Sequence, residues 1–410
     1  MDQEFNRQLK EAVRENRPIL DSLIQKMIQT RSYSGEEGPI VEFLVATMKE
    51  FGFDQAYHDS LGNAVGVIGD GPVKILFDGH IDTVKVTETE NWPHPPFDGK
   101  IVDGKIFGRG VVDEKSAVAG FIVAGKILKE CYEGRDWPFT LTVVGSVQEE
   151  DYDGYPLYHL IEKDGNRPDY VVLGEPTNMR VLRGHRGRME LKLETRGVSA
   201  HGAHNEQGIN AIYKMSRVIQ GIEKLNEELQ PVDPLIKGSA TVSEVRSHAP
   251  SLCSVSDFCQ IHVDRRLTVG ETRETVIAEM EKIAEDAGVE DVVVSIPHYN
   301  GVSWKETKFS QEAYFPTWIL EKDHPLVEAG LDTASEVLER KAEEGFWGFS
   351  TNGVATAGLL NIPTIGFAPG LEELAHSSNE YIVLEDLHKA CEFYVLFPFT
   401  LVEKLNQSTE

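Results

Sequence analysis

The sequence predicts an α/β protein in which a mostly parallel central sheet is interrupted by an inserted α+β domain. Two observations predict this architecture. Short apolar runs alternate with helical stretches in the first part of the chain, which is typical of a parallel sheet covered by helices. In the middle, alternating strands and helices follow one another in βαββαβ order, which is typical of a sandwich with two helices on one face of its sheet.

The first domain begins with helical stretches and then alternates strands with helices. Apolar residues recur at helical spacing over about 18–52, and further helices are predicted at about 115–130 and 155–163. Four short apolar runs have the length and composition of buried strands: AVGVIG, VKILFDGH, FTLTVVGSVQ and DYVVLG. We assign residues 1–186 to the first part of this domain.

The inserted domain is predicted at residues 187–300. MELKLETRG alternates polar and apolar residues, a helix is predicted at about 208–229, and ATVSEV and FCQIHVD alternate again. A second helix at about 271–287 precedes the apolar run VVVSI. These elements supply the βαββαβ order on which the sandwich is predicted.

The α/β pattern returns over residues 301–410, which we assign to the second part of the first domain. A helix is predicted near 324–340, followed by the strand IPTIGF and a final helix. That last helix contains the run CEFYVLFPFTLV, which is too short to span a bilayer and includes Pro398. We therefore interpret it as a core helix.

Composition and charge argue against several classes of function. A chain of 410 residues is long enough for two or three compact units. The formal net charge of −27 argues against nucleic acid and anionic membranes as partners, because both bind clusters of Lys and Arg. The cysteines form no CxxC pair, so neither a thiolate zinc site nor a disulfide framework is predicted. The first residues lack the pattern of a secretory signal, and a cytoplasmic protein is expected.

The motif FDGHID places His80 and Asp82 two residues apart at the end of a predicted strand, where they project to the same side. One of them can bind a metal ion while the other holds the imidazole in place or tunes the charge of the site. On spacing alone, a turn with a hydrogen-bonded histidine is the more frequent explanation. The metal interpretation therefore depends on further ligands.

The motif GRGVVDEKS places Asp113 after glycines and before a helix, where the backbone can turn sharply and expose the carboxylate. For this segment alone, a helix cap is the simpler explanation. Lys115 and Ser116 also suggest a phosphate loop, but the full pattern GxxxxGK[ST] is absent.

The motif VQEED places Glu149 and Glu150 at the end of a predicted strand. Consecutive residues of a strand point to opposite faces, so the two glutamates are not equivalent. One suits a metal ligand and the other a proton carrier on the substrate side, a division of labour that amide hydrolysis requires. An acidic surface loop is the alternative for an isolated run of this kind.

Two further motifs, VVLGEPT and APGLEELAHSSNE, place Glu175 and His376 beyond predicted strands. Each residue alone is more often a loop acid or a surface histidine. In open α/β sheets, however, ligands bind outside the carboxyl ends of the strands. Most of these motifs lie at such ends, and this coincidence predicts a site more strongly than any single motif does.

The residue types at these strand ends suit two divalent cations. Two neutral imidazoles and three carboxylates, one of them bridging, offset about three of the four positive charges, and a bridging hydroxide balances the remainder. Nitrogen and oxygen ligands without thiolate suit Zn²⁺, Co²⁺ or Mn²⁺, and zinc is the expected metal.

With these five motifs in this order, the sequence resembles the M20 family of metallopeptidases and deacylases, which includes acetylornithine deacetylase and succinyl-diaminopimelate desuccinylase. The segments HID, GRGVVDEKS, VQEED, GEPT and AHSSNE match the metal-site segments of that family in kind, order and approximate spacing. The resemblance covers nearly the whole chain. It implies a two-metal hydrolase that cleaves an N-acyl, ureido or peptide bond in a small substrate carrying a carboxylate.

The resemblance also implies a set of metal ligands. Asp113 resembles the bridging ligand between two ions. His80 and Glu175 resemble the ligands of one ion, whereas Glu150 and His376 resemble those of the other.

Two more residues resemble the groups that complete such a centre. Asp82 resembles the acid that supports a ligand from behind. Glu149 resembles the general base that deprotonates the bridging water and later protonates the leaving nitrogen.

The inserted domain resembles the lid of the family, which commonly forms a dimer, and a homodimer through the lid is expected. His201, in RGVSAHGAHNEQGINAI, resembles a lid histidine that stabilises the oxyanion, often across the dimer interface. The nearby His204 suggests a second zinc site in HxxH, but no further ligand cluster accompanies it. A surface or lining role is favoured for that residue.

Three residues resemble groups that contact the substrate. Arg266, in IHVDRRL, resembles an arginine that grips the substrate carboxylate, a bidentate contact that suits guanidinium. We interpret its neighbour Arg265 as a solvated charge on an edge strand. Asn352 and Gly353, in FSTNGVATAG, resemble residues that line the substrate site. The pattern GxSxG is not met there, which excludes a nucleophile elbow.

The sequence departs from the family pattern at two places. An asparagine that often precedes a lid proline is absent from RSHAPS, which leaves Ser247 or His248 in that region, and Glu114 replaces the commoner aspartate after Asp113. Both departures bear on substrate identity rather than on the metal ligands. The phrases RGHRGRME, YFPTW and FSTNGV look most like the YgeY-like branch, which is associated with anaerobic purine breakdown and ureido acids.

Three other functions compete with this interpretation. An aminopeptidase or dipeptidase of the same fold would require a free amine in its substrate, with lid acids to hold it. A catalytically inactive relative could serve as a binding or scaffold protein, but the presence of all five ligands and the base argues against it. An NAD-dependent oxidoreductase is disfavoured because no GxGxxG follows the first strand.

Overall fold

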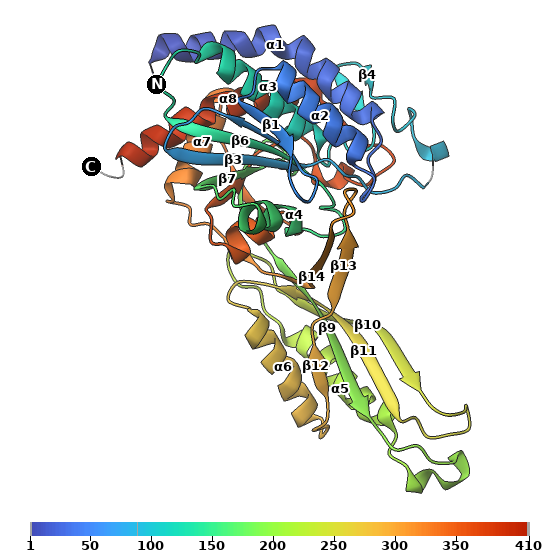
Figure 1. Ribbon diagram of the computed structural model, residues 1–410. Helices are drawn as coiled ribbons and strands as arrows, with labels where there is room; N and C mark the ends of the chain where they lie inside the picture. The colour runs from blue at the N-terminus through green and yellow to red at the C-terminus, as the bar shows by residue number, and fades with distance from the viewer. Residues whose placement is uncertain (1, 88, 408–410) are drawn as a thin grey trace.

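The computed structural model describes residues 2–87 and 89–407. Figure 1 shows a broad α/β domain from which a narrow second domain extends. We name them the catalytic domain and the lid for the roles that the sequence leads us to expect. Segments before and after the lid build the catalytic domain together. The lid is therefore an insertion, in agreement with the sequence.

A nine-stranded sheet forms the centre of the catalytic domain, in the order β1-β2-β6-β3-β7-β18-β8-β16 with β17 beside β8. Four adjacent strands form its parallel core: β6 (Phe139–Ser146), β3 (Val73–His80), β7 (Tyr170–Leu173) and β18 (Thr364–Gly366). The flanking strands are β1 (Gln55–His58), β2 (Ala64–Ile68), β8 (Val181–His185), β16 (Trp318–Ile319) and β17 (Glu344–Trp347). The predicted α/β class is confirmed, although β2 and β8 run antiparallel to the core strands beside them.

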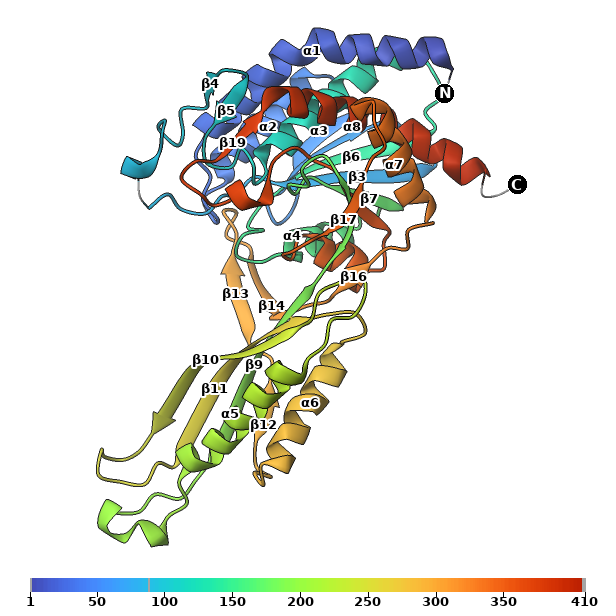
Figure 2. The same cartoon turned by 180° about the vertical axis from the view of Figure 1, so that it is seen from behind.

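Helices cover both faces of this sheet (Figures 1 and 2). The core on one face includes residues of α1 (Gln3–Gln29), α2 (Gly38–Glu50), α3 (Lys115–Cys131), α7 (Pro325–Leu338) and α8 (Leu384–Gln407). Shorter segments cover the other face: α4 (Tyr155–Tyr158) and the π-helical turns His159–Lys163 and Val354–Leu359. The run CEFYVLFPFTLV lies in α8 and is largely buried, which confirms a core helix. No helix in the described part of the chain has the length and apolar character needed to span a bilayer.

The lid has a five-stranded antiparallel sheet in the order β10-β11-β9-β12, with β15 also beside β9. Its strands are β9 (Gly187–Arg196), β10 (Ser239–His248), β11 (Phe258–Leu267), β12 (Val293–Ser295) and β15 (Tyr314–Phe315). Helices α5 (Ala211–Glu228) and α6 (Arg273–Asp286) lie on one face of this sheet (Figure 2). The elements from β9 to β12 follow the predicted βαββαβ order.

The return from the lid to the catalytic domain contains a hairpin of β13 (His298–Val302) and β14 (Lys308–Glu312). The predicted boundary at residue 300 falls inside β13, and β15 still pairs with β9 of the lid. The tip of the hairpin docks on the catalytic domain, where the Trp304 indole N–H donates to the Gly62 carbonyl at 3.0 Å. The structure therefore places the end of the lid sheet at β15, beyond the predicted boundary.

A small sheet brings two distant loops together beside the rim of the main sheet. It consists of β4 (Lys100–Val102), β5 (Lys105–Phe107) and β19 (Tyr381–Val383), in the order β19-β5-β4. The loop that follows β5 contains Asp113, and the loop that precedes β19 contains His376. Pairing of β5 with β19 thus aligns two predicted metal ligands that lie far apart in the sequence.

A buried histidine gives the catalytic domain a specific dependence on pH. The ring of His185 is fully buried, its Nδ1–H donates to the Arg186 carbonyl at 2.8 Å, and its Nε2 accepts the Thr351 backbone N–H at 3.4 Å. Burial lowers the pKa of His185 to about 4. Since the unfolded chain binds this proton near pH 6.5, the ring has no effect on stability above that pH and destabilises the fold as the pH falls toward 4.

We expect His185→Gln to remove this contribution. The slope of unfolding free energy against pH between 6.5 and 4 should become shallower by up to about 1.4 kcal/mol per pH unit, as measured by urea denaturation. The matched control is His298→Gln, which removes an exposed histidine. Equal slopes for the His185 variant and the control would contradict the assignment.

Candidate metal centre

The rim of the main sheet gathers the predicted ligands because its core strands run parallel. His80 ends β3, Glu149 and Glu150 follow β6, and Glu175 lies two residues beyond β7. His80 is in register with Ser146 of β6, so β3 and β6 end level, and Asp78 is in register with Leu173, so β7 ends two residues earlier. Loops after adjacent parallel strands therefore meet at one place, as the sequence predicts.

The imidazole of His80 lies between two oxygen atoms. Its Nδ1 is 3.0 Å from the Asp82 carbonyl oxygen, and its Nε2 is 2.7 Å from Asp113 Oδ1. A neutral imidazole donates only one hydrogen bond, so the second contact requires either an extra proton or a cation at Nε2. With Nδ1–H donated to the carbonyl, the Nε2 lone pair is directed toward Asp113 and suits a metal ion.

Asp113 lies between two histidines. Its Oδ1 faces His80, and its Oδ2 is 3.0 Å from His376 Nε2. His376 Nε2 is also 3.1 Å from Glu150 Oε2. A carboxylate with one oxygen toward each of two imidazoles has the arrangement of a ligand that bridges two cations.

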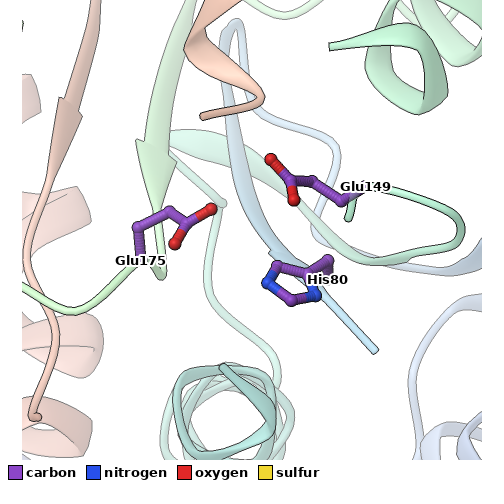
Figure 3. A group of neighbouring side chains, drawn as sticks. All are labelled: His80, Glu149 and Glu175. Carbon is purple, nitrogen blue, oxygen red and sulfur yellow. The ribbon is translucent and has the colours of Figure 1, made fainter. Parts of the chain in front are cut away.

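Two more carboxylates complete the cluster beside His80. Figure 3 shows Glu149 and Glu175 directed toward each other above the imidazole ring. Ligand atoms of these three side chains lie within 4.8 Å of one another, as do those of His80, Asp113 and Glu150. Glu175 Oε2 is buried and has no hydrogen-bond partner among the described residues. Because an unpaired buried carboxylate oxygen is costly, this atom fits a position opposite a cation.

Asp82 is fully buried behind the cluster and holds three parts of it. Its Oδ1 accepts the Glu149 backbone N–H at 3.1 Å, and its Oδ2 accepts that of Glu150 at 3.2 Å. The Ser34 hydroxyl also donates to Oδ2 at 2.7 Å, while the Asp82 carbonyl accepts from His80. Asp82 thus fixes both the His80 ring and the turn that carries the two glutamates.

Electrostatics at the site are dominated by crowded carboxylates around two imidazoles. Burial and then the charge of Glu175 raise the pKa of Glu149 well above its usual range. Burial and then the nearby Glu114 and Asp113 do the same to the pKa of Glu175. Against the effect of burial, the charge of His80 and hydrogen bonds from both histidines hold the pKa of Asp113 below its usual range. Crowded carboxylates that retain protons are expected to exchange them for divalent cations.

The cluster opens into a cavity of about 410 Å³. Carboxylates occupy one wall, and the lid supplies the guanidinium groups of Arg188 and Arg266. Asp264 accepts from Nε and one terminal nitrogen of Arg266 at 2.8 and 3.0 Å, which fixes that side chain and leaves N–H donors for another carboxylate. The lining residues are Asp113, Glu149, Glu150, Asp153, Glu175, Arg188, Arg266, Phe349, Ser350, Glu372, Ala375 and His376.

With this geometry established, comparison with known proteins identifies the family. The model of "Peptidase family M20/M25/M40" matches residues 76–399. The chain belongs to the M20 peptidase family. The resemblance inferred from the five motifs is therefore confirmed.

Relatives within the M20 family cover most of this chain. "Uncharacterized protein YgeY" of Escherichia coli strain K12 is 39% identical over 377 residues, which span 92% of this chain and 93% of the relative. A succinyl-diaminopimelate desuccinylase of Orientia tsutsugamushi strain Ikeda is 23% identical and spans 92% of this chain and 95% of its own. The family thus includes a deacylase and a close homologue whose function is not characterised.

Solved structures of M20 proteins share the fold. Aminopeptidase PepT of Bacillus cereus superimposes with a TM-score of 0.72 at 21% identity, covering 95% of this chain and 99% of its own. YxeP of Bacillus subtilis, described as a dinuclear metal-binding peptidase, superimposes with a TM-score of 0.68 at 13% identity, covering 97% and 100%. At these identities the likeness establishes the two-domain fold and no more.

Other residues predicted from the M20 resemblance lie outside the cavity lining. His201 precedes a 3₁₀ turn (Gly202–Gln207) in the segment at the tip of the lid, far from the catalytic domain (Figure 1). Asn352 is buried, donates to Asp78 Oδ2 at 2.8 Å and accepts the Gly154 N–H at 2.9 Å. Gly353 packs on the Trp318 ring. The structure thus brings Arg266 and the metal cluster together, but not these three.

The residues at the two departures from the M20 pattern also have defined positions. Glu114 is buried, and its Oε1 accepts the His80 backbone N–H at 2.6 Å, so it faces the interior rather than the cavity. Ser247 and His248 lie at the exposed end of β10 on the lid. Arg265, interpreted as a solvated charge, is fully buried and pairs with Glu271 and Glu279. That interpretation of Arg265 was wrong because β11 lies between β10 and β9 rather than at an edge, and the Arg265 side chain faces Glu279 of α6.

Several cavity residues were missed by the sequence interpretation. Asp153 lies in the acidic run after Glu150, and its carboxylate accepts from Arg188 at 3.1 Å and from Ser350. Ser350 and Phe349 lie just before the predicted Asn352 in the same segment. Closeness in sequence to a predicted ligand was the sequence signal that could have identified Asp153. Arg188 gave no such signal, because it occupies a polar position in the regular alternation of β9.

Proposed function

We propose that this protein is a two-metal-dependent hydrolase that cleaves an amide-type bond, N-acyl, ureido or peptide, in a small substrate carrying a carboxylate. The observation that carries the proposal is the convergence of two histidines and four carboxylates at one end of a cavity whose lid side presents arginines. Membership of the M20 family supports the same reaction class.

The proposed metal ligands come from five segments and need no thiolate. Two divalent cations, when bound by these ligands, would act as Lewis acids toward the scissile carbonyl and would lower the pKa of water at the site. Zinc is proposed first, with cobalt and manganese as alternatives, because nitrogen and oxygen ligands suit all three. The proposed ligands are His80, Asp113, Glu150, Glu175 and His376.

Residues of the chain supply the remaining chemistry. Glu149 has its carboxylate in the cavity beside His80, where it can take a proton from the attacking water. When the C–N bond breaks, the same carboxyl group returns that proton to the leaving nitrogen. Arg266, held by Asp264, is proposed to bind the substrate carboxylate. Asn352 and Gly353, which lie outside the lining, are proposed to support the segment whose Phe349 and Ser350 line the cavity.

A homodimer through the lid is proposed as the active form. Strand β10 lies at the edge of the lid sheet, and apolar side chains such as Leu252 and Tyr213 are exposed near its end and on α5. An unpaired edge and exposed apolar side chains favour association with a second copy. In such a dimer, His201 is proposed to reach the active site of the partner and stabilise the oxyanion.

A dipeptidase or aminopeptidase is the second candidate within the same fold. Glu372 and Asp153 line the cavity, and a free carboxylate there could hold a substrate amine. Asp153, however, already accepts hydrogen bonds from Arg188 and Ser350, which favours a substrate without that amine. Hydrolysis that depends strictly on a free α-amine would support the second candidate over the first.

The test combines metal analysis with a substrate screen. We expect two divalent ions per purified chain, and a chelator should abolish hydrolysis that added Zn²⁺, Co²⁺ or Mn²⁺ restores. Metal-loaded protein is then incubated with N-acyl amino acids, dipeptides and ureido acids, and the products are identified by mass spectrometry. Protein that binds no divalent ion, or that hydrolyses equally well after chelation, would refute the proposal.

A further inference from the structure

An ion pair outside the metal cluster joins the two loops that carry Asp113 and His376. Arg109 and Glu380 are buried, and a terminal guanidinium nitrogen of Arg109 lies 2.6 Å from Glu380 Oε2. Arg109 belongs to the loop after β5, and Glu380 immediately precedes β19. Neither residue lines the cavity, so neither is expected to touch the substrate.

Each member of this pair also holds the loop of the other. Glu380 Oε1 accepts the backbone N–H of Val112 at 2.9 Å and that of Asp113 at 3.4 Å. The second terminal nitrogen of Arg109 donates to the His376 carbonyl at 3.1 Å. The Gly108 N–H donates to the Glu380 carbonyl at 3.1 Å, which continues the pairing of β5 with β19.

His376 needs such support because its backbone is strained. Its φ of 59° lies in the left-handed region, which residues other than glycine seldom adopt. A residue keeps such a conformation only where its surroundings fix it. The hydrogen bond from Arg109 to the carbonyl of His376 acts at that residue, and so holds the imidazole toward Asp113.

We propose that Arg109 and Glu380 form a positioning pair that sets Asp113 and His376 at the separation required by one of the two cations. This inference rests on the proposed two-metal function. The affected cation is the one assigned to Glu150 and His376, because His376 is proposed for that position alone, whereas Asp113 would be shared by both. His80 is held instead by Asp82, so the other cation position depends less on the pair.

The test measures metal binding rather than turnover. Metal-free full-length protein is titrated with Co²⁺, and the two dissociation constants and the visible absorption of the bound ion are recorded for wild type, Glu380→Gln and Arg109→Lys. Glu380→Gln keeps the shape of the side chain but removes its charge. Arg109→Lys keeps the charge but removes the planar guanidinium, which donates to two separate acceptors. The matched control is Glu344→Gln, which removes the charge that pairs with Arg183 at 2.6 Å and with Lys322, neither of which is a proposed ligand.

We expect both variants to weaken the second Co²⁺ at least about tenfold and to change its absorption spectrum, while the first Co²⁺ and the control stay like wild type. Should Glu380→Gln fail to fold by circular dichroism, Arg109→Lys decides. The positioning role would be overturned if both variants bound both Co²⁺ ions with wild-type affinity. It would also be overturned if the binding of both ions were weakened equally. A wild-type chain that binds fewer than two Co²⁺ would instead overturn the two-metal function on which it rests.

Discussion

Replacing Glu149 by glutamine is expected to lower kcat about 10²–10⁴-fold while both cations remain bound. Glutamine has nearly the same shape but cannot accept and return a proton at neutral pH. Glu149 shares the cavity with Glu175 and His80, and its main chain is fixed by Asp82, so the substituted side chain should occupy the same place. The loss should therefore appear in kcat rather than in KM.

Three measurements separate this role from a structural one. The metal content of Glu149→Gln should equal that of wild type, its circular dichroism should be unchanged, and its kcat should fall on a substrate found in the screen. Glu344→Gln is the matched control, because Glu344 lies outside the cavity lining and pairs with Arg183 rather than with a proposed ligand. Near-normal turnover in Glu149→Gln, or loss of metal along with activity, would rule out the general-base assignment.

The convergence of the proposed ligands could be predicted from sequence because parallel strands place their carboxyl ends at one rim of the sheet. His80 ends a recognisable apolar strand, and Glu150 and Glu175 each follow one. Parallel strands bring these ends together regardless of the lengths of the connecting loops. His376 and Asp113 meet for a different reason, the pairing of β5 with β19. Strands of three residues carry almost no periodic signal, so that small sheet was not predicted.

Contacts between the domains could not be predicted for a related reason. Arg188 alternates with apolar neighbours as any lid strand does, yet it pairs with Asp153 of the catalytic domain at 3.1 Å. The hairpin tip with Trp304 docks on Gly62, 242 positions away in sequence. Such pairings depend on how the lid sits on the catalytic domain, which local patterns do not encode. Asn352 could not be placed for a similar reason, because its partner Asp78 lies on β3, far away in the sequence.

Replacing His201 by alanine is expected to lower kcat about 10²–10³-fold, the usual cost of removing one donor to a developing oxyanion. The structure gives this prediction a specific form. His201 lies at the tip of the lid, far from the proposed metal ligands of its own chain, so we expect its imidazole to act from a second subunit. Metal content should be unchanged, since no proposed ligand is removed.

Mixing two inactive variants tests that arrangement directly. Chains carrying Glu149→Gln and chains carrying His201→Ala are co-expressed with different tags, and the heterodimer is compared with each homodimer. One of the two active sites of the heterodimer has an intact Glu149 and receives an intact His201, so the purified heterodimer should recover about half of wild-type activity, and the unseparated statistical mixture about a quarter. Co-expression of Glu149→Gln with Asp113→Asn is the control, because both defects lie in the catalytic domain and no intact site forms. Purified heterodimer without recovered activity would show that His201 does not act across the interface.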